Sequence, residues 1–234
     1  MCRVIGKKRG NALNYLVLDL EMCKVPREYQ SRGYLCPMEI IQIGAVLLDE
    51  SFRNMEEISL YVHPEHGVID RFIANLTGIQ RRQVKESKKL REALLELEQR
   101  VSEKGDYKIY TWSGSDYSQL RRELDLKEIS EEAIERFMEQ ERWVDYQKIF
   151  GERYRLGRKV SLEEALSLCG ITPDGKAHNG LDDSINTGYI IEKLEKDTDF
   201  QLIHYDGKEK LDSEPMSFGL GSLLAGIQLD DSTS

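Results

Sequence analysis

Residues 15–22 of this 234-residue chain read YLVLDLEM, and the architecture can be worked out from this segment. It is largely aliphatic and contains no Gly or Pro, which predicts a buried strand over residues 15–20. Because side chains alternate along a strand, Asp19 and Glu21 point to one face, and Leu18 and Leu20 point to the other, into the core. Acids at a strand end are often only solvated, but an Asp inside an otherwise apolar strand favours a functional site.

Two more strands follow at short intervals, IIQIGAVLL at 40–48 and ISLYV at 58–62, and Pro64 ends the second of them. Three consecutive strands joined by short links predict an antiparallel meander. A further strand, YKIYTW, is expected at 107–112. The predicted helices span residues 69–76, 87–104, 116–124, 130–141, 161–169 and 182–196. Strands that come first and then alternate with helices predict an α/β fold with a mixed central β-sheet flanked by helices.

Two of these helices carry capping signals. Ser87 is the expected N-cap of its helix and Gly105 the expected C-cap. Ser161, with Glu164 three residues later, resembles a capping box. The segment WVDYQKIF at 143–150 mixes strand and helix signals.

Length and composition indicate one soluble α/β domain with a substantial core. No apolar run approaches the ~20 residues that a membrane-spanning helix needs. The basic start of the chain precedes an apolar stretch that is short and contains an Asp, so no signal peptide is expected. The four cysteines, Cys2, Cys23, Cys36 and Cys169, form no CxxC, which favours reduced thiols and a cytoplasmic protein.

Three more residues have the character of active-site groups. Asp116 follows TWSGS and opens a predicted helix, His178 lies in the loop DGKAHNGL, and Asp183 lies in the first turn of the next helix. Each has a structural alternative, since an Asp at a helix start is often an N-cap and a loop histidine is often a surface group. Their order and context, together with Asp19 and Glu21, favour a functional role for all three.

Four carboxylates and one histidine suit a site where two divalent ions about 3.5–4 Å apart assist phosphodiester cleavage. Hard oxygen ligands favour Mg²⁺ or Mn²⁺. The histidine supplies a general base near pH 7. Asp182, next to Asp183, is assigned the simpler role of a helix-dipole partner.

The pattern resembles the DEDD superfamily of 3′→5′ exonucleases in its histidine-bearing branch, the DEDDh or DnaQ-like enzymes. That family carries Asp-x-Glu on the first strand, then a middle Asp, then His-x4-Asp. The matching residues here are Asp19, Glu21, Asp116, His178 and Asp183. The resemblance spans residues 14–195 and also covers EIIQIGAVLLD at 39–49, NLTGIQ at 75–80 and SLEEALSLCGI at 161–171.

The resemblance implies an RNase H-like fold and hydrolysis from the 3′ end with release of nucleoside 5′-monophosphates. Asp19, Glu21 and Asp183 would then hold the first metal ion and its water. His178 would take the proton of that water. The second ion would be held by Asp19 and the substrate phosphate, with Asp116 acting through water or at the second ion.

The resemblance also implies contacts with the terminal nucleotide. Met22, Leu76 and Thr77 are expected to pack on its base and ribose, and such contacts suit unpaired ends of any sequence. Core packing is an equally good alternative for Leu76. His63 and His66 follow a strand near a turn and are expected in a solvated loop.

Trp112, four residues before Asp116, resembles the W-x-x-x-D arrangement of Eri-1-like enzymes, although its ring is expected in the core. With the insert at 23–39, it favours similarity to Eri-1-like and KapD-like exoribonucleases and single-stranded RNA 3′ ends or short oligonucleotides as substrates. A DNA-directed proofreading or repair exonuclease is an alternative with the same chemistry. A non-catalytic nucleic-acid-binding or regulatory module is an alternative of another class, and the complete set of five residues speaks against it.

The net charge of −9 is unusual for a nucleic-acid-binding protein, but it is unevenly distributed. Residues 197–234 contain eight acids and two bases, a net charge of −6, so residues 1–196 carry −3. Two Mg²⁺ ions would cancel the four proposed ligand charges, and weak, non-processive binding is expected. We expect an exonuclease domain at 1–197 and an acidic, flexible tail at 198–234, whose apolar stretch at 218–229 could dock on the domain or on a protein partner.

Overall fold

The computed structural model describes residues 13–30 and 32–203. One mixed sheet lies at its centre, with the strand order β3-β2-β1-β4-β5. β1, β2 and β3 pair antiparallel, whereas β4 runs parallel to β1 and β5 parallel to β4. The predicted meander and mixed sheet are therefore confirmed. The strands are β1 (Asn14–Lys24), β2 (Met38–Leu48), β3 (Asn54–Tyr61), β4 (Tyr107–Thr111) and β5 (Trp143–Asp145).

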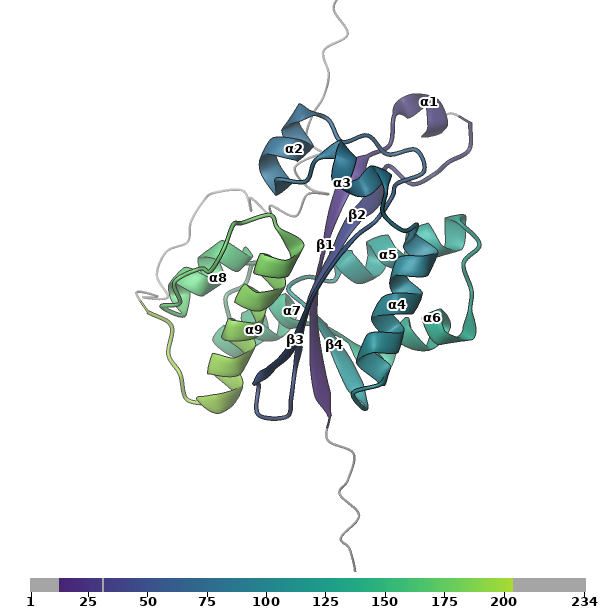
Figure 1. Ribbon diagram of the computed structural model, residues 1–234. Helices are drawn as coiled ribbons and strands as arrows, with labels where there is room; N and C mark the ends of the chain where they lie inside the picture. Colours follow the sequence, from purple (N-terminus) through teal and green to yellow (C-terminus); the bar gives the residue numbers. More distant parts are fainter. Residues whose placement is uncertain (1–12, 31, 204–234) are drawn as a thin grey trace, which may run out of the picture.

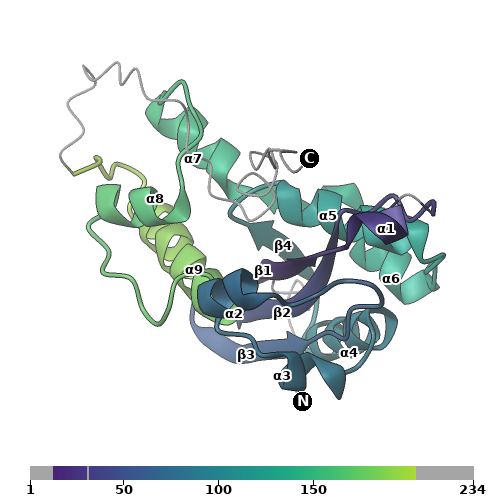
Figure 2. The same cartoon turned by 90° about the horizontal axis from the view of Figure 1, so that it is seen from above.

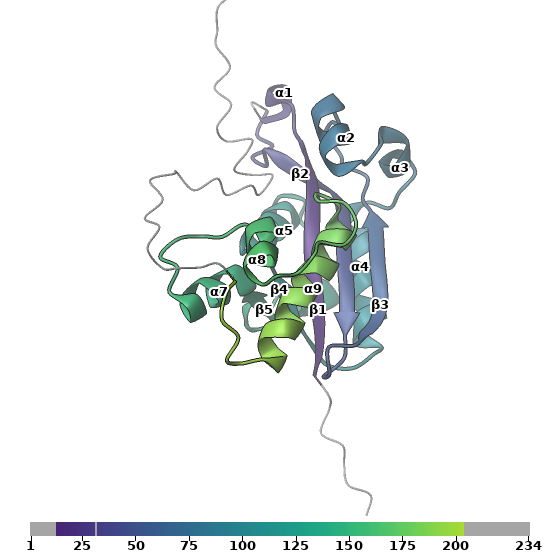
Figure 3. The same cartoon turned by 90° about the vertical axis from the view of Figure 1, so that its left-hand side faces the viewer.

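Helices cover both faces of this sheet (Figures 1 and 3). α4, α5 and α6 pack on one face, and α7, α8 and α9 pack on the other. The α-helices are α1 (Arg27–Gln30), α2 (Arg71–Thr77), α3 (Arg81–Lys85), α4 (Leu90–Ser102), α5 (Ser115–Leu126), α6 (Glu132–Phe137), α7 (Tyr146–Tyr154), α8 (Leu162–Leu168) and α9 (Gly180–Lys196). A 3₁₀ turn, η1, spans Gln140–Arg142.

The alternation of side chains along β1 divides the core into two parts. Leu16, Leu18 and Leu20 belong to the part beneath α4 and α5, whereas Val17 belongs to the part beneath α8 and α9. The odd-numbered residues of β1 share the face of Val17. The two acids of this strand therefore face the layer that contains α8 and α9.

Both ends of α4 differ from the prediction. α4 begins at Leu90 with Lys89 as its N-cap. The prediction of Ser87 as the cap was wrong because its hydroxyl donates to the Gln83 carbonyl in α3. Gly105 was predicted as the C-cap, but that position is Glu103, and Gly105 takes a positive φ of 125° just beyond it.

The structure explains the mixed sequence signals of residues 143–150. The segment 143–150 holds both a strand and a helix, since β5 ends at Asp145 and α7 starts at the next residue. Asp145 caps α7 by accepting a hydrogen bond from the Lys148 amide at 3.0 Å. The predicted cap Ser161 is confirmed, since its hydroxyl accepts from the Glu164 amide at 3.1 Å.

Three further predictions concern membrane-spanning helices, the cysteines and the tail. Across 13–30 and 32–203, no helix combines the length and the apolar character needed to cross a bilayer. Cys23, Cys36 and Cys169 are buried free thiols, as predicted, whereas Cys2 lies outside the described residues. Phe200 and Ile203 bond to the body of the domain through Tyr154 and Leu168, so packing continues beyond the predicted boundary at residue 197. The apolar stretch at 218–229 lies outside the described residues.

α1, α2 and α3 gather at the end of the sheet where β1 ends (Figures 1 and 2). We call this region, residues 24–37 and 63–89, the cap. Its two segments join where the Val68 amide donates to the Lys24 carbonyl at 2.8 Å. Lys88 similarly bridges to Val62 at the end of β3.

A buried polar network fastens the cap to the sheet. Glu39 at the start of β2 accepts hydrogen bonds from the Tyr34 hydroxyl at 2.6 Å and from Lys127 Nζ at 2.9 Å. Lys127 also pairs with Glu123 at 2.9 Å, and the Glu123 carboxylate accepts from the Ile40 amide at 2.7 Å. The other donors to Glu39 are the backbone amides of Glu65, His66 and Gly67. The network therefore links both cap segments to β2 and α5.

Candidate active site

β1 carries Asp19 and Glu21 to the cap end of the sheet, on the face covered by α9 (Figure 1). Glu21 is only 3% exposed, so its carboxylate lies within the domain rather than at a solvated strand end. The pairing of β1 with β2 shifts register directly after Glu21. β4 pairs with β1 only as far as Val17, which leaves the acidic half of β1 without a neighbour on that edge.

Two small or polar residues of β2 hold the start of α9 against the sheet. A Cβ on Gly44 would lie 1.9 Å from the carbonyl carbon of Gly180, so strand and helix touch backbone to backbone. The Gly180 amide also donates to Oε1 of Gln42 at 3.1 Å. This docking fixes the first turn of α9, which contains Asp183, opposite the two acids of β1.

Replacement of Gly44 by Ala is expected to destabilise the protein by about 3 kcal/mol, because the added methyl group overlaps the α9 backbone. Urea unfolding followed by circular dichroism measures this change. Gly188→Ala is the matched control on α9, since a Cβ there would meet its nearest atom, on Leu48, at 3.5 Å. We expect Gly188→Ala to leave stability within about 1 kcal/mol of the wild type. Equal losses in the two variants would contradict the importance of the close contact.

The loop before α9 places His178 beside Asp183. His178 has a φ of 62°, in the left-handed region that costs a non-glycine residue roughly 1 kcal/mol or more. Its backbone amide donates to Oδ2 of Asp183 at 2.9 Å. The acid in the first turn therefore stabilises the unusual backbone that presents the imidazole.

α5 brings Asp116 to the same end of the sheet. The N-cap position of α5 is Gly114, and Asp116 lies in the first turn with only 6% of its surface exposed. Since Gly114 holds the N-cap position, the alternative that Asp116 serves as the N-cap is wrong. The backbone of Leu20, on the edge of β1 that β4 leaves free, partly offsets the effect of burial on the pKa of the Asp116 carboxyl.

Burial and neighbouring carboxylates make it costly for these four acids to ionise. Burial, followed by repulsion from Asp116, Asp183 and Glu21, raises the pKa of Asp19 well above its usual range. Burial and repulsion from Asp183 and Asp116 raise the pKa of Glu21 to about 8. Burial is also the main cause that raises the pKa of Asp116 to about 7 and that of Asp183 to about 7.

This excess of negative charge fits divalent cations. Ligand atoms of Glu21, His178 and Asp183 lie within 4.8 Å of one another, close enough to share one ion. Asp19 lies on the same strand face as Glu21, and Asp116 is buried in the first turn of α5. Buried carboxylate oxygens are the hard donors that Mg²⁺ and Mn²⁺ prefer. The residues present therefore fit the predicted cofactor class.

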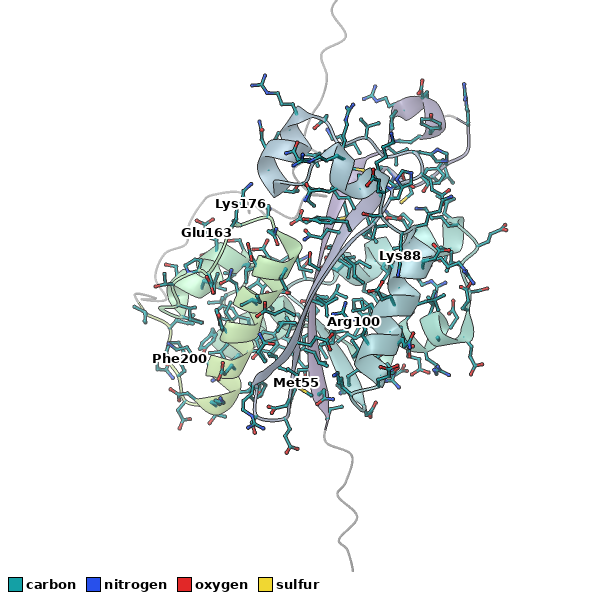
Figure 4. All side chains as sticks on the ribbon, in the orientation of Figure 1. Met55, Lys88, Arg100, Glu163, Lys176 and Phe200 are labelled. Atoms are coloured by element: carbon teal, nitrogen blue, oxygen red, sulfur yellow. The ribbon has the colours of Figure 1, made fainter. Side chains whose placement is uncertain are left out.

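His178 is partly buried, and its surroundings favour the neutral imidazole. Desolvation lowers its pKa, Glu163 raises it, and Lys176 lowers it. A neutral imidazole at pH 7 is the form that can accept a proton. Figure 4 shows Lys176 on the loop that leads into α9, on the side toward α2.

Lys176 and Asp182 fix this loop from both sides. The Lys176 amide donates to Oδ2 of Asp182 at 2.8 Å. Asp182 therefore holds this loop in addition to the helix-dipole role that the sequence predicted for it. Nζ of Lys176 donates to the carbonyl of Asn75 in α2 at 3.3 Å. The loop that carries His178 is therefore tied to α9 and to the cap.

The predicted nucleotide-contacting residues lie at the junction of the cap and the sheet. Met22 is 8% exposed, and Leu76 packs partly against the core. Thr77 is 1% exposed, and its hydroxyl donates to the Ile73 carbonyl and accepts from the Ile79 amide. A contact from Thr77 to a nucleotide would therefore come from its backbone.

Sequence reasoning missed Gln42, Gly44 and Lys176. The first two carried a usable signal, since a Gln and a Gly interrupt the otherwise apolar IIQIGAVLL. Lys176 had no such signal, because its partner in α2 is distant in sequence. His66 also differs from the solvated-loop prediction, since its ring is partly buried and stacks on Tyr29 with centroids 4.5 Å apart.

Comparisons with known proteins agree with this geometry. The chain is 27% identical to the 3′-5′ exonuclease Snipper of Drosophila melanogaster over 178 residues, which cover 68% of this chain and 62% of Snipper. It is 31% identical to human ERI1 exoribonuclease 2 over 187 residues, which cover 68% of this chain and 26% of that protein. The chain thus spans less than two thirds of the length of these relatives.

A solved structure supports the fold. The nuclease domain of 3′hExo, a DEDDh family member bound to rAMP, superposes with a TM-score of 0.67 at 22% identity, covering 82% of this chain and 96% of that one. This similarity confirms the predicted RNase H-like fold. The profile of the family described as "Exonuclease" matches residues 16–191. Since this match covers well over half of the sequence, the chain belongs to the exonuclease family.

Proposed function

We propose that this protein is a metal-dependent 3′→5′ exonuclease that acts on single-stranded 3′ ends and releases nucleoside 5′-monophosphates. The observation that carries the proposal is the approach of ligand atoms of Glu21, His178 and Asp183 to within 4.8 Å of one another. Burial raises the pKa of both carboxyl groups, which supports the same reading. We assign the activity to a domain of residues 1–197, together with the residues up to 203 that pack on it. The remaining tail is proposed as a segment for protein contacts.

We propose the following roles for the residues of the site. Asp19, Glu21 and Asp183 would hold one divalent ion, and Asp19 with Asp116 would lie toward a second. DEDDh exonucleases use divalent metal ions, and we propose Mg²⁺ or Mn²⁺ here. When bound, two such ions supply Lewis acidity to the attacking and leaving oxygens of the phosphate. His178 would accept the proton of the attacking water at an imidazole nitrogen.

RNA is the favoured substrate. Two observations support it: human ERI1 exoribonuclease 2 is an exoribonuclease by name, and 3′hExo was solved with rAMP. Met22, Leu76 and the Thr77 backbone would contact the terminal nucleotide. DNA is the alternative substrate, since Snipper is named an exonuclease without reference to the sugar.

The proposal is tested with 5′-labelled single-stranded RNA and DNA of one sequence, each incubated with Mg²⁺ or Mn²⁺. We expect a ladder that shortens from the 3′ end, disappears with EDTA and forms faster on RNA. Binding without cleavage of either strand under all these conditions would instead indicate a non-catalytic nucleic-acid-binding module.

His178→Ala is expected to lower kcat about 10²- to 10³-fold, because the general base is lost. The free energy of unfolding should change little, since the amide that bonds Asp183 is retained. The rate is measured by single turnover at a saturating metal concentration. Under this condition, any weakening of metal binding by the substitution does not lower the rate. A fully active His178→Ala protein would rule out this histidine as the base.

A further inference from the structure

The charge of the chain is divided between the cap and the rest of the molecule. The cap contains nine basic and four acidic side chains, a net charge of +5, whereas the whole chain carries −9. All other residues together therefore carry −14. A region of positive charge on so acidic a chain indicates a binding surface for an anion.

The cap also lies next to the candidate active site. α1, α2 and α3 surround the end of β1 that carries Asp19 and Glu21 (Figures 1 and 2). Lys176, on the His178 loop, reaches the carbonyl of Asn75 in α2 at 3.3 Å. The cap therefore borders the site through both its helices and the His178 loop.

Several arginines of the cap are available for an external anion. Arg27, Arg71 and Arg82 are exposed and form no ion pair with any other residue in the part of the chain that the structure describes. Elsewhere arginines commonly lie within 4.0 Å of a carboxylate. Examples are Arg53, Arg100, Arg121, Arg136 and Arg142.

The cap offers aromatic surface as well as charge. Phe72 in α2 is 45% exposed. The Tyr29 and His66 rings stack at 4.5 Å, and the ring of Tyr34 meets His66 edge-on at 4.6 Å. Cations combined with aromatic rings are the usual composition of surfaces that bind single-stranded nucleic acid, because phosphates meet the charges and bases meet the rings.

We propose that the cap binds the phosphodiester backbone of the strand upstream of the scissile bond, with Arg27, Arg71 and Arg82 as phosphate-binding residues. This inference rests on the proposed exonuclease function and adds its substrate-binding surface. The cap would contribute to the affinity for long strands and little to the chemistry at the terminal nucleotide.

The test compares the triple variant Arg27→Gln/Arg71→Gln/Arg82→Gln with a control of equal charge change, Arg53→Gln/Lys104→Gln/Lys108→Gln. The control residues lie at the opposite end of the sheet, near the β2–β3 turn and the start of β4. Both proteins and the wild type are assayed on a single-stranded RNA of about 20 nucleotides and on a dinucleotide.

We expect the cap variant to raise KM for the long RNA about tenfold, with kcat and dinucleotide cleavage unchanged. The slope of log(kcat/KM) against log[salt] should become less steep by about 2, since each phosphate contact on a single strand contributes roughly 0.7. The control should match the wild type. An unchanged KM and slope on the long RNA, or an equal loss on both substrates, would overturn the proposal.

Fluorescence anisotropy with the same RNA in Ca²⁺ buffer separates this inference from the proposed function. If the wild type binds RNA but hydrolyses neither substrate, the exonuclease proposal fails, and weaker binding by the cap variant still supports the cap. If all three proteins bind equally, the cap proposal fails even though cleavage is observed.

Discussion

Asp183→Asn should lower the rate of hydrolysis at least 10³-fold and, in EDTA at pH 8, should raise the melting temperature. The loss of activity follows from the loss of an anionic ligand at the centre of the site, where metal ions supply several kcal/mol of transition-state stabilisation. The substitution keeps an oxygen that can accept the hydrogen bond of the His178 amide. The fold should therefore be retained.

The gain in stability follows from the raised pKa values. The pKa of Asp183 is raised to about 7 and that of Glu21 to about 8, chiefly by burial, so the folded protein keeps protons that the unfolded chain loses near pH 4. The free energy of unfolding of the metal-free protein therefore falls as the pH rises from about 4 to about 8. Removal of one acid should restore about 2 kcal/mol at pH 8, or roughly 5 °C, and almost nothing at pH 4.

Asp182→Asn is the matched control, because it makes the same change one residue earlier. Asn can still accept the hydrogen bond from the Lys176 amide, so activity should stay within about threefold of the wild type. Thermal unfolding in EDTA at pH 4 and pH 8 measures both proteins. If Asp183→Asn were less stable than the wild type at pH 8, the raised pKa of the Asp183 carboxyl would be contradicted.

Lys127→Met is expected to destabilise the protein by about 3–5 kcal/mol, because it leaves Glu39 and Glu123 buried without their cation. The Lys127 side chain is 6% exposed, and both carboxylate side chains are 0% exposed. Burial alone would raise the pKa of Glu39, but Lys127, Tyr34 and the backbone amides lower it to about 2. Glu123 has fewer donors, and burial raises its pKa despite Lys127.

Lys148→Met provides the comparison for this experiment. Lys148 pairs with Glu152 at 4.0 Å, and both side chains are about 70% exposed, so its loss should change stability by less than about 1 kcal/mol. Urea unfolding measures both variants. A Lys127→Met protein as stable as Lys148→Met would mean that the buried acids protonate at little cost.

The sequence predicted the sheet and most of the site because its signals are local. A polar residue in an apolar strand identified Asp19, and strand alternation placed Glu21 on the same face. Short links between strands predicted the meander. Asp116 was harder, because an acid at a helix start fits both a cap and a ligand. Only the structure distinguishes the two, because it places Gly114 at the N-cap position and buries Asp116 in the first turn.

The features that sequence reasoning missed depend on contacts between distant segments. Glu39 and Lys127 are 88 positions apart, so neither position suggested a buried ion pair. Lys176 and Asn75 are likewise separated by 101 positions. Ser87 was misassigned because a nearer carbonyl, in α3, competes for its hydroxyl. Local sequence patterns predict helices and strands, whereas the contacts between these elements become visible only in the three-dimensional structure.

The direction of β1 has a practical consequence for handling the molecule. The strand begins at Asn14, and Glu21 lies toward its other end. At about 3.3 Å per residue, roughly 23 Å separate the two. A bead, dye or chip surface linked just ahead of the strand would thus leave the cap facing the solution. The molecule can be tethered by that side while single strands are presented to it freely.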